Sequence, residues 1–173
     1  MKKLTVLIAA LTVALFIAGC VTSGPTVSDK LNDAKGSAPP GTLVGQGSAK
    51  ESSKEAAEKK AKDRAYFALV KGLTFIAKDI IDDAVTAGRL TTADADALKI
   101  NVQSAIARSA LNRAVRVDAG TIGKDEAWAV YYLDKADALK EIDAAVAASS
   151  PPRGFNTNSF ESKYPAAANR DWK

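Results

Sequence analysis

The stretch Tyr66–Ala84, YFALVKGLTFIAKDIIDDA, decides the fold predicted for this chain. Apolar side chains recur in it every three or four residues, which is the period of a helix with one buried face. The members of this stripe are Tyr66, Leu69, Val70, Leu73, Ile76, Ile80 and Ala84. Gly88 follows, and glycine readily adopts the left-handed conformation found just after a helix. We therefore expect a long helix that ends near Ala87.

The segment before this stripe, Lys50–Arg64, predicts a different environment. It has no apolar side chain larger than alanine and is rich in Lys and Glu. The pairs Glu55/Lys59 and Glu58/Lys62 have the i,i+4 spacing that stabilises an exposed helix. We expect the helix to begin at Lys50 with a charged, solvated overhang. Disorder of this overhang, or its docking on a partner, is the alternative.

Two further helices are predicted downstream. The second runs over Thr92–Asp118, with Thr91 as N-cap and Asp94 as a capping partner three positions on. The third begins at Lys124 after Gly123 and stops before Pro151-Pro152, because proline cannot continue a helix. Its apolar side is supplied by Trp128, Tyr131, Tyr132, Leu139, Ile142 and Val146.

An internal similarity links these elements. Val85–Leu98 aligns with Val117–Val130, and Gly88 then matches Gly120. Each copy has a glycine, a following apolar residue and an acidic residue where a helix start is expected. Two copies are fewer than the three that helical repeat arrays need, so we interpret them as one helix corner used twice.

The expected fold class is all-α, an antiparallel three-helix bundle with a long first helix. The bundle is expected over residues 50–148, preceded by a flexible N-terminal tether at 20–49. The tether is predicted because Val21–Ser48 is rich in Gly, Ser, Thr and Pro and has no helical period. Residues 149–173 are expected to form an extended, aromatic-containing tail.

The first twenty residues have the layout of an export signal. Met1-Lys2-Lys3 is positively charged, Leu4–Ala18 is apolar, and Ile17-Ala18-Gly19-Cys20 ends on the only cysteine. The apolar run is about 15 residues, shorter than the roughly 20 of a membrane-spanning helix. This segment resembles the lipobox of bacterial lipoproteins. The resemblance implies a signal peptide over residues 1–19 and cleavage between Gly19 and Cys20. It further implies a diacylglycerol on the Cys20 sulfur and a fatty acid such as palmitate on the new amino terminus.

The resemblance also carries an expected location. Position two of the processed chain is Val21 rather than Asp, and by resemblance to the sorting signal of Gram-negative lipoproteins this favours the outer membrane, facing the periplasm. A Gram-positive cell surface or the inner membrane is the alternative, as is an ordinary secretory signal with an incidental cysteine. The expected lipid partner is the membrane itself, which several acyl chains hold stably.

Composition excludes several classes of chemistry. The chain has no His and one Cys, which excludes Ser-His-Asp and Cys-His catalysis, His-containing zinc sites and an intrachain disulfide. Two of the 24 Lys and Arg residues leave with the signal, which lowers the net charge from +4 to +2. We expect no nucleic-acid partner at this charge, no metal and no cofactor apart from the covalent lipid.

A cluster of carboxylates on the first helix is the remaining candidate for catalysis. Asp79, Asp82 and Asp83 lie at i, i+3 and i+4, and Asp94 and Asp96 form another pair. Such groups bind cations or act as acid and base. They lack a histidine or a calcium-loop spacing, so we interpret them as solvated helix faces and expect no enzymatic activity. An enzyme that uses carboxylates alone is the alternative.

The C-terminal tail carries the candidate partner-binding residues. Its aromatic side chains are Phe155, Phe160, Tyr164 and Trp172, and Lys173 is the last residue. The first three are expected to pack back on the bundle; binding to a partner is the alternative. The end, Arg170-Asp171-Trp172-Lys173, resembles the C-terminus of murein lipoproteins. That resemblance implies a covalent link from Lys173 to peptidoglycan.

The sequence thus predicts a non-enzymatic, membrane-anchored lipoprotein that binds an envelope protein or peptidoglycan. A structural lipoprotein that contacts the cell wall through its C-terminus is one alternative. Small size, the acyl anchor and the absence of site chemistry also resemble small phage- and prophage-encoded lipoproteins, which implies a role in exclusion or lysis as a second alternative.

Overall fold

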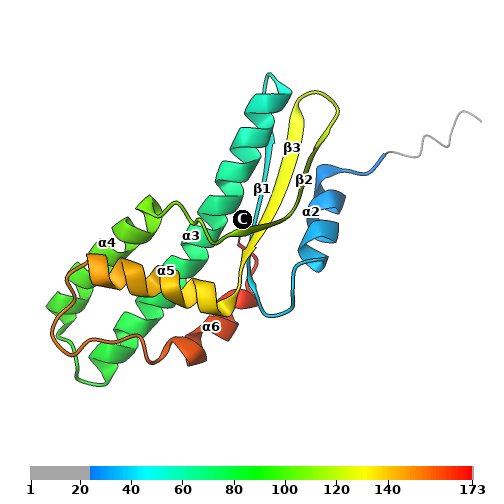
Figure 1. The fold of residues 1–173 in the computed structure, drawn as a ribbon. Coiled ribbons are helices and arrows are strands. Elements are labelled where there is room, and N and C mark those ends of the chain that lie inside the picture. Colours follow the sequence, from blue (N-terminus) through cyan, green and yellow to red (C-terminus); the bar gives the residue numbers. More distant parts are fainter. Residues whose placement is uncertain (1–23, 173) are drawn as a thin grey trace, which may run out of the picture.

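The computed structural model describes residues 24–172, which fold into five helices and a three-stranded antiparallel sheet (Figure 1). The prediction of an all-α three-helix bundle is therefore wrong, and the fold is mixed α/β. In chain order the elements are α2 (Val27–Gly36), β1 (Leu43–Lys50), α3 (Lys54–Thr86), α4 (Thr92–Arg108), β2 (Val115–Ile122), β3 (Glu126–Leu133), α5 (Lys135–Ala148) and α6 (Phe160–Ala168).

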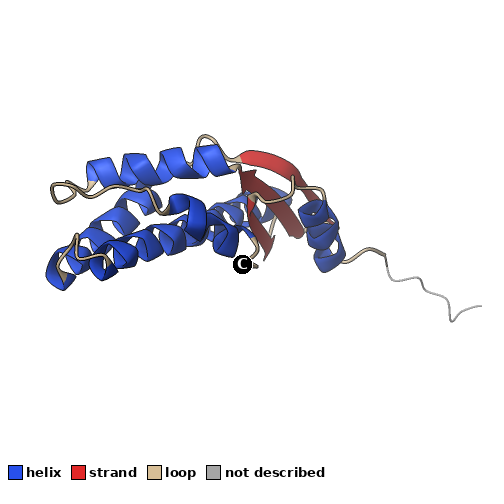
Figure 2. Cartoon of the chain, turned by 90° about the horizontal axis from the view of Figure 1, so that it is seen from below, coloured by secondary structure: helices blue, strands red, loops and turns tan. Residues whose placement is uncertain are grey.

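Helix α3 is the longest element, and the sheet and helices α4, α5 and α6 pack along it. It has 33 residues, which corresponds to about 50 Å of helix. The sheet lies along its N-terminal half, and α2 covers the opposite face of the sheet (Figure 1). Helices α4, α5 and α6 gather around its C-terminal half, so the strands with α2 lie at one end of an elongated molecule and these three helices toward the other (Figure 2).

The sheet has the order β1-β3-β2, with β3 in the centre. Strand β1 pairs with β3 from Leu43↔Leu133 to Lys50↔Glu126, and β2 joins β3 through a hairpin. The two faces of β3 contribute to different cores. The main core against α3 takes Ala127, Ala129, Tyr131 and Leu133, and a smaller one under α2 takes Trp128 and Val130.

Strand β1 lies unusually close to α3. A Cβ atom at Gly45 would lie 2.3 Å from the carbonyl oxygen of Ala65, and one at Gly47 would lie 2.3 Å from that of Ala61. Only glycine therefore fits at these two positions. Ala57, Ala61 and Ala65 are fully buried, so the expected solvated overhang over 50–64 is wrong. Alanine and glycine together build a close contact that needs no large apolar side chain.

The segment after Arg108 departs from the predicted helices. The second helix ends ten residues early and the third begins at Lys135, because Val115–Leu133 forms the β2–β3 hairpin. β-Branched and aromatic residues favour strands over helices. The N-cap at Thr91 is confirmed, since its Oγ1 accepts from the Asp94 backbone N–H at 3.1 Å.

The interpretation of the internal similarity as a repeated helix corner is also wrong. Its first copy is the α3–α4 corner, where Gly88 has φ +67°. Its second copy is the hairpin, in which Gly120 lies inside β2 and the turn glycine is Gly123, with φ +68°. One sequence pattern therefore serves two different turns.

The segments predicted as tether and tail are folded where the structure describes them. The predicted tether contains α2 and β1, and the predicted tail contains α6. Phe160 and Tyr164 are each 2% exposed, and Phe155 packs against the same core. The expectation that these three aromatics pack back on the helices is confirmed, although Phe160 and Tyr164 do so from helix α6 and not from an extended tail.

Candidate functional site

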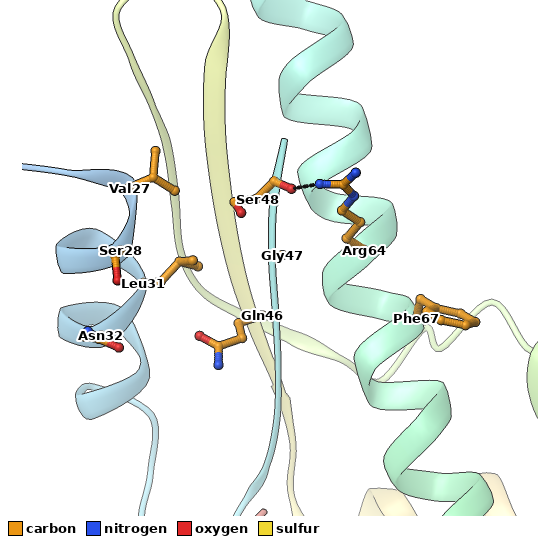
Figure 3. A pocket seen from close by; sticks show the side chains of 9 residues that line it. All are labelled: Val27, Ser28, Leu31, Asn32, Gln46, Gly47, Ser48, Arg64 and Phe67. Carbon is orange, nitrogen blue, oxygen red and sulfur yellow. Dashed lines mark hydrogen bonds between the residues drawn. The ribbon is translucent and has the colours of Figure 1, made fainter. Parts of the chain in front are cut away.

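A groove along the outer edge of β1 is the candidate binding site. It encloses about 620 Å³ between α2 and α3 (Figure 3), a volume within the range of ligand pockets. Its lining residues are Val27, Ser28, Leu31, Asn32, Gln46, Gly47, Ser48, Arg64 and Phe67. We call this the β1-edge groove.

Helix α2 forms one wall and is fixed at both its start and its inner face. Thr26 and Asp29 form a reciprocal cap, with the Thr26 N–H donating to Asp29 Oδ2 at 2.8 Å. These hydrogen bonds to Thr26 hold the pKa of the Asp29 carboxyl below its usual range. Ala34 packs with Trp128 and Val130 of the sheet. The wall therefore presents Val27 and Leu31 toward the strands (Figure 3).

Helix α3 forms the other wall, at Arg64. The Arg64 guanidinium donates a hydrogen bond to the carbonyl oxygen of Ser48, across the edge of β1 (Figure 3). Phe67, one turn further along α3, is 59% exposed and points away from β1 in this view. Arg64 is the one charged residue among the nine that line this groove, and it lies at the strand edge.

The floor of the groove is the edge of β1 itself. In an antiparallel pair, alternate residues direct both backbone groups toward the partner strand and the residues between them direct theirs away. Glu51 N–H donates to Asp125 O at 2.9 Å on the β3 side, whereas Ser48 O accepts from Arg64. Gln46 and Ser48 therefore turn their backbone groups toward the groove.

The groove continues beyond Ser48 into a smaller hollow. This hollow encloses about 170 Å³ and shares Val27, Ser48 and Arg64 with the larger one. Its far end is closed by Lys50, whose ammonium lies 3.2 Å from Glu126 Oε1. Hydrogen bonding to Glu126 and the charge of Asp125 raise the pKa of Lys50.

The near end of the groove is covered by the C-terminal segment. Trp172 pairs with Gly45 in a parallel β-bridge at the β1 edge. The Asp171 carboxylate accepts from Gln46 Nε2 at 2.5 Å and from Lys35 Nζ at 2.9 Å. The indole of Trp172 contacts Phe75 of α3, with 5.6 Å between ring centroids. The segment is thus held by backbone, charge and aromatic contacts.

The predicted site residues do not gather at this groove. Gly19, Cys20 and Lys173 lie outside the described residues. Phe160 and Tyr164 belong to the core and Phe155 packs against it, so these three supply stability rather than an accessible surface. Of the predicted partner-binding residues, Trp172 lies nearest the groove, at its covered end.

Sequence reasoning missed Gln46, Ser48 and Arg64. One signal was present: in 43–49 every second residue is Leu, Gly or Ala, and the residues between are Val, Gln and Ser. This alternation has the period of a strand. A second signal was Thr26 and Asp29, whose spacing is that of a capping box.

Two carboxylates of α3 form ion pairs with neighbouring helices. Asp82 pairs with Lys99 of α4 at 2.5 Å, and Asp83 pairs with Lys163 of α6 at 2.8 Å. The hydrogen bond that Lys163 donates to Asp83 raises the pKa of Lys163. Among residues 24–172, no group of three or more His, Cys, Asp or Glu side chains is arranged to hold a metal ion.

Comparison of the chain with protein-family models, with curated proteins and with solved structures found no match. The part of the chain that the structure describes holds no helix whose length and hydropathy suffice to cross a bilayer. The functional argument therefore proceeds from the β1-edge groove and the sequence.

Proposed function

We propose that this protein is a membrane-anchored lipoprotein of the bacterial envelope that binds another envelope component and catalyses no reaction. The observation that carries the binding role is the β1-edge groove. Arg64 is the only ionisable side chain of Asp, Glu, His, Lys or Arg type among its nine lining residues. The groove therefore offers a ligand one positive charge and a defined shape, and its lining supplies no carboxylate, histidine or lysine to act as general acid or base.

The proposed anchor is supported by the sequence of the first twenty residues. Ile17-Ala18-Gly19-Cys20 resembles a lipobox, and Cys20 is the only cysteine of the chain. A single cysteine in an exported chain has no partner for an intrachain disulfide, and lipidation would account for its presence. The outer membrane, facing the periplasm, is the proposed location because Val21 follows Cys20.

Lipidation is tested by labelling cells that express the full chain with a palmitate analogue. The wild-type chain is expected to incorporate the label and to fractionate with membranes. Cys20→Ser is expected to lose both properties. Label on the Cys20→Ser chain, or membrane association that survives this substitution, would contradict the anchor. A form joined to peptidoglycan through Lys173 is distinguished in the same cells, because it stays with the detergent-insoluble cell wall.

The binding role is tested by photocrosslinking in cells, with benzoylphenylalanine at three exposed positions. Asn32 lies at the groove, Asn101 on α4 and Lys140 on α5. A discrete adduct from any of these positions supports an envelope partner. Its absence from all three, in cells where the lipidated chain reaches the membrane, would contradict the binding role.

A further inference from the structure

We infer that the β1-edge groove binds an extended peptide strand that carries a carboxylate. The inference rests on the proposed function, for which it names the chemical class of the partner. It is carried by three observations: an unpaired strand edge, a groove of peptide dimensions beside it, and a lone arginine at its rim.

The edge of β1 already pairs with another segment of the chain at one point along its length. Trp172 pairs with Gly45 in parallel at the covered end of the groove. Directly beyond it, the carbonyl of Gln46 and the N–H of Ser48 point away from β3 toward the groove, by the alternation of the β1–β3 ladder. An edge with unsatisfied N–H and C=O groups is a template for an added strand. The C-terminal segment therefore shows which type of chain this edge accepts.

The dimensions of the groove fit a short peptide. The two adjoining hollows run along β1 from Gln46 to Lys50, which is about 17 Å of strand at 3.3 Å per residue. A strand of about five residues covers this length. It lies between α2 and α3, and these two walls keep another sheet from pairing edge to edge with β1.

The walls select side chains on alternate residues of the added strand. Successive side chains of a strand point to opposite faces. Those directed to α2 meet Val27 and Leu31, which favour apolar side chains. Those directed to α3 meet Arg64. The expected ligand is therefore apolar at every second position and acidic at one position between.

Arg64 has no carboxylate partner among residues 24–172. Among the described residues, no ion pair involves it and no acidic side chain lines the larger hollow. Its guanidinium instead covers the carbonyl of Ser48. When a strand adds to the edge, its N–H replaces Arg64 at this carbonyl. The guanidinium is then free to hold a carboxylate, with which it forms the strongest of its hydrogen bonds.

Other occupants fit the groove less well. A nucleic acid needs several cations that follow its phosphates, whereas the two hollows hold only Arg64 and Lys50, and Lys50 is paired with Glu126. A second copy that paired β1 with β1 would bring two Arg64 side chains to one interface, where the acidic lining residue Glu126 is already paired with Lys50. A peptide with a carboxylate satisfies both the edge and the charge.

The experiment uses the full chain in detergent and a library of random seven-residue peptides. Each peptide is displayed both as a C-terminal acid and as an amide, so that a terminal and a side-chain carboxylate are distinguished. The peptides enriched on the wild-type chain are compared with those enriched on Ser28→Trp and Asn32→Trp. These two variants fill the groove from exposed positions of α2, and far-ultraviolet circular dichroism checks their fold.

The expected result is a set of acidic peptides with alternating apolar residues, enriched on the wild-type chain and not on the filled variants. Arg64→Gln is expected to weaken binding of the best peptide about tenfold or more. Lys62→Gln is the matched control, because it removes the same charge from the same helix outside the groove and leaves affinity unchanged. Replacing the carboxylate of the peptide by its amide weakens binding to wild type but not to Arg64→Gln.

Backbone pairing is tested separately on the same peptide. N-methylation of alternate residues is expected to abolish binding in one register and to be tolerated in the other, since only every second N–H faces β1. The inference is overturned if no peptide is enriched over the filled variants, if Arg64→Gln binds as well as wild type, or if both methylation registers are tolerated. If any of these results is found while a partner is still crosslinked in cells, the peptide inference is contradicted and the proposed function is not.

Discussion

The hydroxyl of Tyr164 accepts a hydrogen bond from the backbone N–H of Leu43, with 3.0 Å between the two atoms. The same hydroxyl donates to the carbonyl of Leu133 at 3.3 Å. Leu43 and Leu133 are register partners in the β1–β3 ladder, so the side chain of α6 completes the end of the sheet. The C-terminal helix is therefore part of what holds β1 in place.

Tyr164→Phe is expected to destabilise the protein by about 1–3 kcal/mol, because it leaves a buried N–H and a buried C=O without their partner. The free energy of unfolding in urea measures this. Tyr132→Phe, on the same sheet but with a half-buried ring, is the control and is expected to change stability by less than about 0.5 kcal/mol. Equal effects of the two substitutions would contradict the role given to Tyr164.

Alkaline pH is expected to weaken the fold through the same residue. Burial raises the pKa of Tyr164 to about 12 from its usual value of 10.0. The folded state thus favours the neutral phenol. The stabilisation that this preference gives the folded state is complete below pH 10 and is lost as the pH rises through about 12. The urea midpoint of the wild type should fall more steeply over this interval than that of Tyr164→Phe; parallel curves for the two proteins would refute the assignment.

Gly47→Ala is expected to destabilise the protein by at least about 1–3 kcal/mol, because its Cβ would lie 2.3 Å from the carbonyl oxygen of Ala61 and strand β1 would have to move off α3. Thermal unfolding followed by circular dichroism measures the loss. Gly36→Ala is the control, since a Cβ there meets nothing within 4 Å. A wild-type melting temperature for Gly47→Ala would show that β1 does not need its close approach to α3.

Glu141→Ala is expected to destabilise the protein by about 2–3 kcal/mol. The Glu141 carboxylate is buried and accepts from Ser109 Oγ at 2.7 Å and from Arg113 Nη1 at 2.8 Å. It thereby holds the loop between α4 and β2. Glu161→Ala, at an exposed carboxylate of α6, is the control and should change the free energy of unfolding by less than about 0.5 kcal/mol. A Glu141→Ala variant as stable as this control would refute the structural role.

The C-terminal two thirds of α3 could be predicted from the sequence, because large apolar residues mark a buried face. The cap at Thr91 and the inward packing of Phe160 and Tyr164 followed from equally local signals. Strand β1 could not be recognised in this way. Its glycines and alanine resemble a linker, and they form a strand only because Ala61 and Ala65 of α3 leave room for the backbone to approach.

Strand β3 was missed for a different reason. Trp128, Tyr131 and Tyr132 have the i, i+3, i+4 spacing of one helix face, and the apolar residues between them, Ala129 and Val130, hide the alternation of a strand. The pairing of Tyr131 with Gly45 and Arg116 across the sheet decides it. The groove was missed because α2, β1 and α3 contribute its residues from separate segments, and charge or motif analysis of any one segment shows none of it.

The position at which α2 begins sets how far the proposed lipoprotein reaches from its membrane. Val27 lines the groove and follows Cys20 by seven residues, a span of at most about 25 Å when fully extended. The predicted tether of 20–49 would have given several times that reach. The binding edge of such a lipoprotein is then confined to a thin layer next to the lipid headgroups. A partner has to enter this layer itself, so membrane-bound or membrane-skimming proteins encounter the groove far more often than components that diffuse through the cell-wall layer beyond it.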